Sequence, residues 1–218
     1  MGRNREQEAI RILDRKQQVL ETAFRLFAER GIDVVTMPEI AEASGVPRAT
    51  LYRYVSDKME LVVEIGAWKW REYIMSRDAM TSANELEKMS GADRLRWYMD
   101  AFIDLYRNHK DLLRFNYFYN GFVMNGRSTA EQQSPYLKVI EGLKASFHGI
   151  YEKCLEEGTI RKDLSEEIMV SSSFHIMLAA VTRYAVGLVY VPQTGADPEA
   201  ELVMLEKALL REYMVGEK

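Results

Sequence analysis

One short segment of the chain carries residue types that can read duplex DNA. Four of them fall at helical spacing and share one face of a predicted helix: Arg48, Ala49, Tyr52 and Arg53. An arginine can bond O6 and N7 of guanine with both arms of its guanidinium, and an alanine lets a helix approach a thymine methyl closely. Lys58 falls in the first turn of the next expected helix, where a cation opposes the helix dipole, so a phosphate partner would explain its place. These residues predict contacts to both bases and backbone.

Two short helices and a tight turn are needed to present these side chains, and the preceding residues encode that arrangement. Thr36, with Glu39 three positions on, has the spacing of a capping box. Gly45 tolerates a positive φ, so the chain can turn sharply there, and Pro47 suits the opening of the second helix. Two short helices joined by a glycine-containing turn are the signature of a helix-turn-helix.

The same stretch resembles the DNA-binding domain of the TetR family of transcriptional regulators. The resemblance rests on a long spaced pattern formed by Thr36, Ile40, Ala41, Ala43, Gly45, Val46, Thr50, Leu51, Tyr52, Tyr54, Lys58 and Leu61. Pro47 departs from it, because serine is usual there and a capping hydroxyl is lost, and Val55 stands where a larger phenylalanine is usual.

The residues and the resemblance together predict a DNA-contacting set. Its members are Thr36, Pro47, Arg48, Ala49, Thr50, Tyr52, Arg53, Tyr54 and Lys58. The expected partner is a double-stranded DNA operator. A helical hairpin inside some other all-α domain is the alternative interpretation of the same stretch.

The overall charge does not by itself favour nucleic-acid binding. The 218 residues carry a formal net charge of −4, and residues 1–60 hold 10 Lys and Arg against 10 Asp and Glu. DNA binding must therefore rest on the local placement of cations. The N-terminal arginines could form an arm that reaches the backbone or minor groove, although a solvated tail is the expectation we favour. They are Arg3, Arg5, Arg11 and Arg15.

Several other classes of protein are disfavoured by the sequence. No apolar run follows Met1, so we expect no signal peptide, and the most apolar stretch, 176–191, is interrupted by Arg183 and is too short to span a membrane. The single cysteine, Cys154, excludes an intrachain disulfide and fits a reducing cytoplasm. The three histidines lack metal-ligand spacing, and no P-loop, dinucleotide fingerprint or nucleophile elbow is present. We therefore expect no metal, no cofactor and no enzymatic activity.

Helical periodicity along the chain, with only 5 Pro and 13 Gly, predicts an all-α fold. The resemblance implies a helix-turn-helix DNA-binding domain over residues 1–57 and a helical effector-binding and dimerisation domain over residues 58–218. Beyond the helix-turn-helix, capping residues and breaks place helices at about 8–30, 57–80, 93–109, 112–124, 134–157, 165–190 and 199–213, with a loop over 81–92.

The second predicted domain is rich in aromatic and methionine residues. Pockets for small organic ligands are mostly apolar, so this composition favours an apolar or aromatic effector, whose existence the resemblance implies. The candidates to line the pocket are Tyr98, Phe102, Tyr106, Phe118, Phe122, Tyr151, Phe174 and Met177. Each of them could instead be an ordinary core residue.

A homodimer is expected, because one recognition helix contacts too few base pairs to select a site. The two last helices could form a four-helix bundle about a two-fold axis. Ala179, Ala180 and Gly187 are small enough for close helix approach, and a leucine stripe could seal the interface: Leu202, Leu205 and Leu209. These helices could instead only close the monomer core.

The leading interpretation is therefore a sequence-specific transcriptional regulator, a repressor released from its operator by a small effector. The alternative is an all-α enzyme or interaction module whose hairpin does not bind DNA. An activator also remains open.

Overall fold

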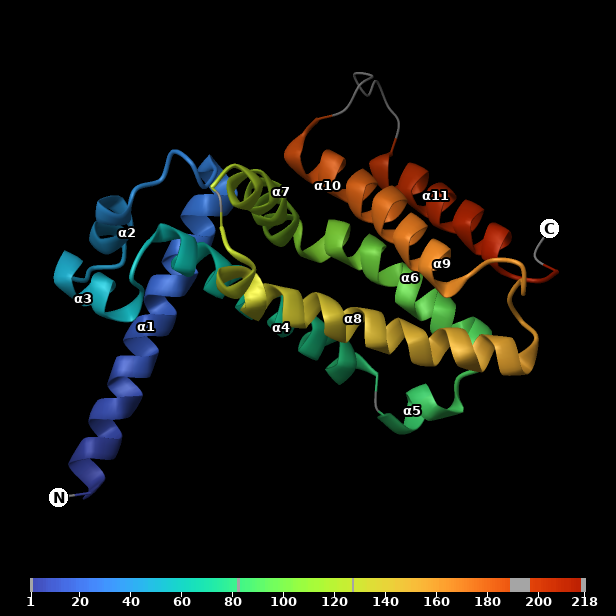
Figure 1. Ribbon diagram of the computed structural model, residues 1–218, viewed down its shortest axis with the longest axis horizontal. Helices are drawn as coiled ribbons and strands as arrows, with labels where there is room; N and C mark the ends of the chain where they lie inside the picture. Colours follow the sequence, from blue (N-terminus) through green and yellow to red (C-terminus); the bar gives the residue numbers. More distant parts are fainter. Residues whose placement is uncertain (1, 82, 127, 189–196, 217–218) are drawn as a thin grey trace. The chain divides into compact units, whose positions relative to one another are not determined.

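The computed structural model describes residues 2–81, 83–126, 128–188 and 197–216, and the side chains of these residues except 2–6, 9, 83 and 84. Over these ranges the chain is helical, with no strand beyond an isolated bridge between Ile160 and Met214 (Figure 1). In chain order the helices are α1 (Gly2–Arg30), α2 (Met37–Ala43), α3 (Arg48–Tyr54), α4 (Lys58–Met80), α5 (Ala83–Lys88), α6 (Gly91–Asn108), α7 (Lys110–Asn125), α8 (Ala130–Glu157), α9 (Glu166–Ser173), the π-helix η1 (Phe174–Leu178), α10 (Ala179–Val186) and α11 (Pro198–Tyr213). The predicted all-α fold is confirmed.

The chain divides into two compact units. The first comprises Met1–Lys69 and Arg114–Leu137, and the second comprises Trp70–Leu113 and Lys138–Lys218. The division falls inside α4, α7 and α8 rather than at the predicted boundary after residue 57. The physical reason lies in the first turns of α4, where the side chains of Leu61, Val62 and Ile65 are completely buried. Compactness does not test what each part does, so the assignment of functions to residues 1–57 and 58–218 stays a prediction.

The helix-turn-helix is anchored to α1 by a small apolar core. Phe27, Ile40 and Leu51 contribute one completely buried side chain each from α1, α2 and α3. Gly31 takes a φ of +90°, which ends α1 where the sequence predicts. At the other end, α1 begins at Gly2 and not near Glu8, so the predicted solvated tail is the first part of a helix.

Aromatic side chains dominate the rest of the first unit. The rings of Phe24 and Phe115 lie 5.5 Å apart, and those of Tyr119 and Tyr136 stack at 4.4 Å. The Tyr136 hydroxyl donates a hydrogen bond to Oδ1 of Asn116 at 3.0 Å. The aromatic sequence of α7, which could equally indicate a ligand pocket, is therefore used here largely for packing.

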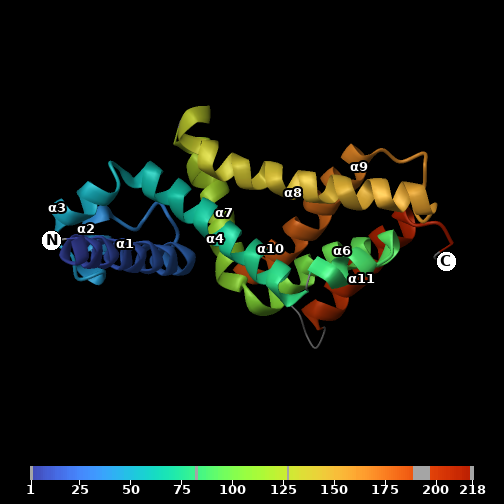
Figure 2. The ribbon, with the colours of Figure 1, turned by 90° about the horizontal axis from the view of Figure 1, so that it is seen from below.

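The second unit is organised around α6, which packs against both α10 and α11. α8 and α9 lie side by side and are joined by a 2.8 Å contact between His148 Nδ1 and the Glu166 carboxylate (Figure 2). Completely buried side chains from five elements form the core: Met99, Phe147, Met169, Met177 and Leu202.

The segment predicted as a loop over residues 81–92 contains α5 and the start of α6. The Ser90 hydroxyl accepts a hydrogen bond from the Asp93 backbone N–H at 3.1 Å, which caps α6 and lets the helix begin at Gly91. Gly91 is therefore a packing residue and not a loop residue. A Cβ there would lie 2.8 Å from the backbone nitrogen of Cys154.

α8 begins before the predicted cap at Ser134. Thr129 and Gln132 form a reciprocal cap, with the Thr129 N–H donating to Gln132 Oε1 at 2.9 Å and the Gln132 N–H donating to Thr129 Oγ1 at 3.2 Å. The helix therefore starts at Ala130, and Pro135 lies inside it.

The helix predicted over residues 165–190 starts as expected, with the Ser165 hydroxyl accepting from the Ile168 N–H at 3.3 Å. η1 interrupts it, and it ends at Val186 because Gly187 takes a left-handed φ of +77°. The predicted end at Tyr190 lies outside the described residues.

Candidate nucleic-acid interface and ligand groove

α3 presents the predicted reading face to solvent. Leu51 is completely buried and Val55 is 2% exposed, so the helix is held by its inner side. On the opposite side Arg48, Ala49, Tyr52 and Arg53 are all exposed. Neither guanidinium has an ion-pair partner in the described part of the chain, so both remain available to base edges or phosphates.

The N-terminus of α2 is fixed by the predicted capping box. The Thr36 N–H and hydroxyl donate to the Glu39 carboxylate at 2.7 and 2.8 Å, and the Glu39 N–H donates to the Thr36 hydroxyl at 3.4 Å. The hydrogen bonds from Thr36, backbone first, and a further one from Arg30 lower the pKa of Glu39 to about 2. Thr36 remains exposed, so its hydroxyl can still face a phosphate.

The flanks of α3 hold the other predicted contacts. Pro47 caps the helix through its carbonyl, which accepts from the Thr50 N–H at 2.8 Å, and no side-chain cap is present. Pro47 is exposed, whereas Thr50 and Tyr54 are half-buried. The capping hydroxyl that the TetR pattern supplies at this position is thus absent.

Lys58 is held by partners within its own unit. Its Nζ donates to the backbone carbonyl of Asp33 at 3.2 Å and lies 5.4 Å from the centre of the Phe122 ring. Burial lowers the pKa of this lysine. The bond to Asp33 uses one of the three N–H donors of the ammonium, so the others can still reach a phosphate.

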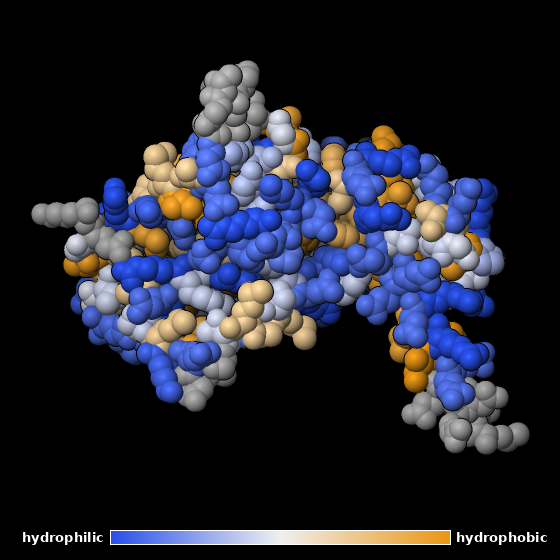
Figure 3. Space-filling model, turned by 180° about the vertical axis from the view of Figure 1, so that it is seen from behind, coloured by the Kyte–Doolittle hydropathy of each residue, from blue (hydrophilic) through white to orange (hydrophobic). Residues whose placement is uncertain are grey.

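The N-terminal part of α1 projects with an exposed apolar surface, visible in orange beside grey atoms in Figure 3. Ile10, Ile12 and Leu13 are 53%, 46% and 66% exposed. Arg11 and Arg15 are also exposed, as an arm toward DNA requires. The side chains of Arg3 and Arg5 lie outside the described set.

The structure gathers only some of the predicted effector-binding residues. The ring of Phe102 lies 6.3 Å from that of Tyr98 and 5.6 Å from that of Phe174. Tyr98 also contacts Phe147, with centroids 5.1 Å apart. The Tyr98 hydroxyl is buried without a hydrogen-bond partner, and burial raises its pKa.

The remaining candidates are dispersed. Met177 is completely buried, Tyr106 packs against Tyr184 at 6.1 Å, and Tyr151 donates to the Leu164 carbonyl at 3.1 Å. Two others belong to the first unit, where Phe118 lies against Gly31 and Phe122 lies near Lys58. The eight candidates are therefore divided between the two units, six in the second and two in the first.

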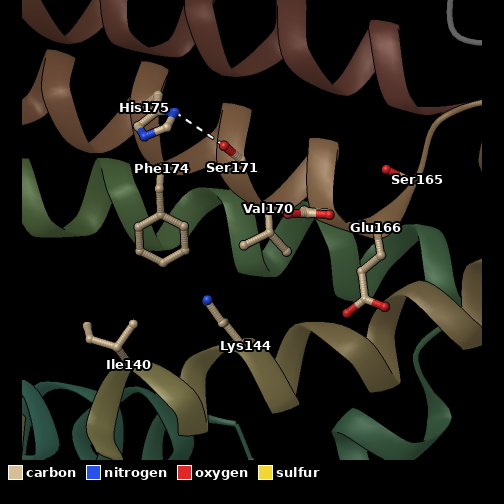
Figure 4. Close-up of a pocket in the computed structure, with 9 residues that line it drawn as sticks. Ile140, Lys144, Ser165, Glu166, Val170, Ser171, Phe174 and His175 are labelled. Atoms are coloured by element: carbon tan, nitrogen blue, oxygen red, sulfur yellow. Dashed lines mark hydrogen bonds between the residues drawn. The ribbon is translucent and has the colours of Figure 1, made fainter. Parts of the chain in front are cut away.

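A groove of about 650 Å³ lies between α8 and the α9–η1 segment (Figure 4). Phe174 is the one predicted effector residue among those that line it: Ile140, Lys144, Ser165, Glu166, Glu167, Val170, Ser171, Phe174 and His175. Its volume is in the range of small-molecule sites. The sequence did not predict the groove. Its lining residues alternate between apolar and polar at helical spacing, and a helix face exposed to solvent has the same pattern.

Polar contacts organise the walls of this groove. The Glu166 carboxylate is bound by His148, whose pKa is raised by that hydrogen bond and by the charges of Glu166 and Glu152. His175 Nδ1 lies 3.3 Å from the Ser171 hydroxyl. Lys144 extends from α8 toward Phe174 and Val170 (Figure 4).

Comparison with known proteins bears on the helix-turn-helix. Residues 19–65 match the family model described as bacterial regulatory proteins, tetR family. Residues 19–65, which include the helix-turn-helix, are therefore similar to the TetR-family DNA-binding domain. The chain is 38% identical over 72 residues to the transcriptional regulator AcrR of Shigella flexneri, a match that covers 33% of this chain and 31% of AcrR.

Longer similarities to TetR-type regulators extend beyond residue 65. The transcriptional repressor KstR2 of Mycobacterium tuberculosis is 25% identical over 162 residues, covering 71% of this chain and 74% of the repressor. Among solved structures, FadR from Bacillus subtilis in complex with stearoyl-CoA has a TM-score of 0.68 at 18% identity, over 90% of this chain and 98% of FadR. KstR2 has a TM-score of 0.59 at 18% identity, over 92% and 95% of the two chains. The structural similarities establish a shared fold.

The predicted dimer residues have unequal exposure. Leu202 is completely buried and Leu209 is 8% exposed, so both pack in the core of the second unit, and their place in an interface stays a prediction. Leu205 and Ala180 are half-buried, and Ala179 is exposed. Gly187 ends a helix and is not inside one. The exposed apolar residues on these elements are instead Ile168, Ile176, Leu188 and Met204.

Membrane-spanning helices and metal-binding clusters are both absent from the described residues. No helix among them is long and apolar enough to cross a membrane. No group of three or more His, Cys, Asp or Glu side chains there could hold a metal ion. Cys154 is buried, and burial raises its pKa.

Proposed function

We propose that this chain is a cytoplasmic transcriptional repressor that binds a DNA operator as a homodimer and is released by a small, mainly apolar effector. The observation that carries the proposal is the outer face of α3. An exposed tyrosine and two arginines without an ion-pair partner among the described residues stand on a helix whose inner side is held by Leu51 and Val55. A rigid helix with free guanidiniums is what base recognition in the major groove requires.

Selection of bound duplexes from a random pool tests DNA recognition directly. The expected product is a palindrome whose half-sites are separated by about one helical turn, since a two-fold dimer imposes its symmetry on the site. Affinity for the selected duplex should fall steeply with salt, because phosphate contacts release counterions. Enrichment of no common sequence would contradict the proposal.

The dimer is supported by the apolar residues left exposed on the last helices. Ile168 and Ile176 are 54% and 40% exposed, and Met204 is 61% exposed. A charge at Ile176 should give a folded monomer with poor operator affinity, whereas a charge at buried Leu209 would disturb the core. Met124→Glu is a matched control, because Met124 is 83% exposed and lies in the first unit. Sedimentation of Ile176→Asp as a stable dimer would refute this interface.

The groove between α8 and α9–η1 is the proposed effector site. It combines apolar side chains from both walls with a few polar groups, as small-molecule sites do. The fold neighbour FadR is crystallised with stearoyl-CoA, a ligand with a long apolar tail. Effector binding should weaken operator affinity in the same concentration range in which it saturates the protein.

A further inference from the structure

We propose that the effector is an amphipathic anion, an apolar body with one carboxylate-like end, and that Lys144 binds this end. This inference rests on the proposed effector site. The amine of Lys144 is directed into the groove between Phe174 and Val170 (Figure 4). In the described part of the chain this amine has neither an ion-pair partner nor a hydrogen-bond acceptor.

The acidic side chains of the groove do not compensate this cation. The Glu166 carboxylate lies 2.8 Å from His148 Nδ1, and it forms no ion pair with Lys144 in the described part of the chain. Glu167, which also lines the groove, is exposed. His175, the other basic side chain of the lining, lies within hydrogen-bond distance of Ser171. Neither Lys144 nor Glu167 has a charged partner among the described residues, and Lys144 is the one whose amine is directed into the groove (Figure 4).

The surroundings of Lys144 determine the rest of the ligand. Ile140, Val170 and Phe174 are half-buried and supply apolar surface on both walls. The Phe174 ring rests edge-on against Phe102 at 5.6 Å, so the apolar surface continues into the core. Phe174 also opens the π-helix η1, and short π turns inside helices are frequent at functional sites. Lys144 is exposed, so an anionic end would gain an attraction to its ammonium that a neutral molecule lacks. An anion without an apolar body would leave the apolar surface in water.

Decanoate, decyl phosphate and decanol are suitable probes, because they share one chain and differ in the head group. Their dissociation constants for the purified full-length chain are measured by calorimetry. Decanoate or decyl phosphate should bind about three- to tenfold tighter than decanol, as expected for a charge-assisted hydrogen bond that remains partly exposed. The preferred anion tells whether the head group is carboxylate or phosphate.

Variants on α8 test the role of the lysine. Lys144→Gln should remove the preference for anions while leaving decanol binding unchanged, and Lys144→Arg should retain it. Lys138→Gln is the control, because it removes the same charge from an exposed position on the same helix that does not line the groove. Equal affinities for decanoate, decyl phosphate and decanol, an equal loss with Lys138→Gln, or no binding of any probe at millimolar concentration would overturn the proposal.

Binding of duplex DNA, measured without any probe, tests the proposed function separately from the ligand class. If the chain binds no duplex DNA but shows an anion preference that depends on Lys144, the ligand class stands and the repressor function falls. If it binds an operator but the preference is absent in the native chain, the function stands and the ligand class falls.

Discussion

Replacing Tyr98 by phenylalanine should stabilise the free protein, although most substitutions of buried tyrosines destabilise. The Tyr98 side chain is 8% exposed, and its hydroxyl has no hydrogen-bond partner. The ring itself is well placed, with edge-on contacts to Phe102 and Phe147. The substitution keeps these contacts and removes only the unpaired oxygen.

The magnitude follows from what the hydroxyl loses on folding. A buried polar group without a partner costs about 1–3 kcal/mol of desolvation, so its removal should raise the free energy of unfolding by about 1 kcal/mol or more. Tyr213→Phe is the matched comparison. The Tyr213 side chain is 2% exposed, and its hydroxyl lies 2.7 Å from that of Ser172 and 3.3 Å from the Met169 carbonyl. Its loss should cost about 1 kcal/mol.

Urea unfolding followed by circular dichroism measures both variants against the native chain. We expect the midpoint to move up for Tyr98→Phe and down for Tyr213→Phe, with unchanged slopes. Equal destabilisation by the two substitutions would refute the reasoning, because it would show that the Tyr98 hydroxyl is satisfied in solution. A water molecule bound to that hydroxyl would produce such a result.

Four other predictions concern the DNA-reading unit and the contact between α8 and α9. Arg48→Ala should weaken specific operator binding by about 1–3 kcal/mol and relax preference at one position, whereas unchanged preference in duplex selection would exclude base contact. Lys58→Ala should weaken binding to all duplexes alike and make the salt slope shallower by about one unit, which titrations at several salt concentrations measure. Thr36→Ala should destabilise α2 by about 1 kcal/mol, whereas Thr36→Ser should be nearly neutral in the same thermal scan. The raised pKa of His148 predicts that its contribution to stability is full below the unfolded value of about 6.5 and is lost as pH rises through the folded value. The difference in urea midpoint between the native chain and His148→Gln should therefore shrink on raising the pH.

The features that the sequence predicts well are those decided by residues close together in the chain. The capping box needs only Thr36 and Glu39, and the end of α1 needs only Gly31. Errors arose where two local signals competed: Ser134-Pro135 resembles a helix start, but the reciprocal cap of Thr129 and Gln132 lies upstream and satisfies the first N–H groups.

Features that depend on distant segments could not be predicted. The groove exists because Lys144 on α8 faces Val170 on α9, and no periodicity within either helix contains that juxtaposition. The same holds for Gly91, which resembles a loop glycine in sequence but is needed because Cys154 passes so close. Leu202 and Leu209 form a regular stripe, and a stripe does not tell whether the covering surface comes from the same chain or from a partner.

The environment of Lys58 fixes the position from which this residue can contact DNA. Its Nζ already has a hydrogen bond to the Asp33 carbonyl, and the ring of Phe122 is near. The ammonium has two further N–H donors, so a phosphate contact adds a charge-assisted bond to a side chain that is already held in place. Arg48 and Arg53 are exposed and have no ion-pair partner among the described residues, so both guanidiniums are available to base edges. Most of the specific binding energy should accordingly come from the outer face of α3, and Lys58 should act mainly to position that helix on the duplex.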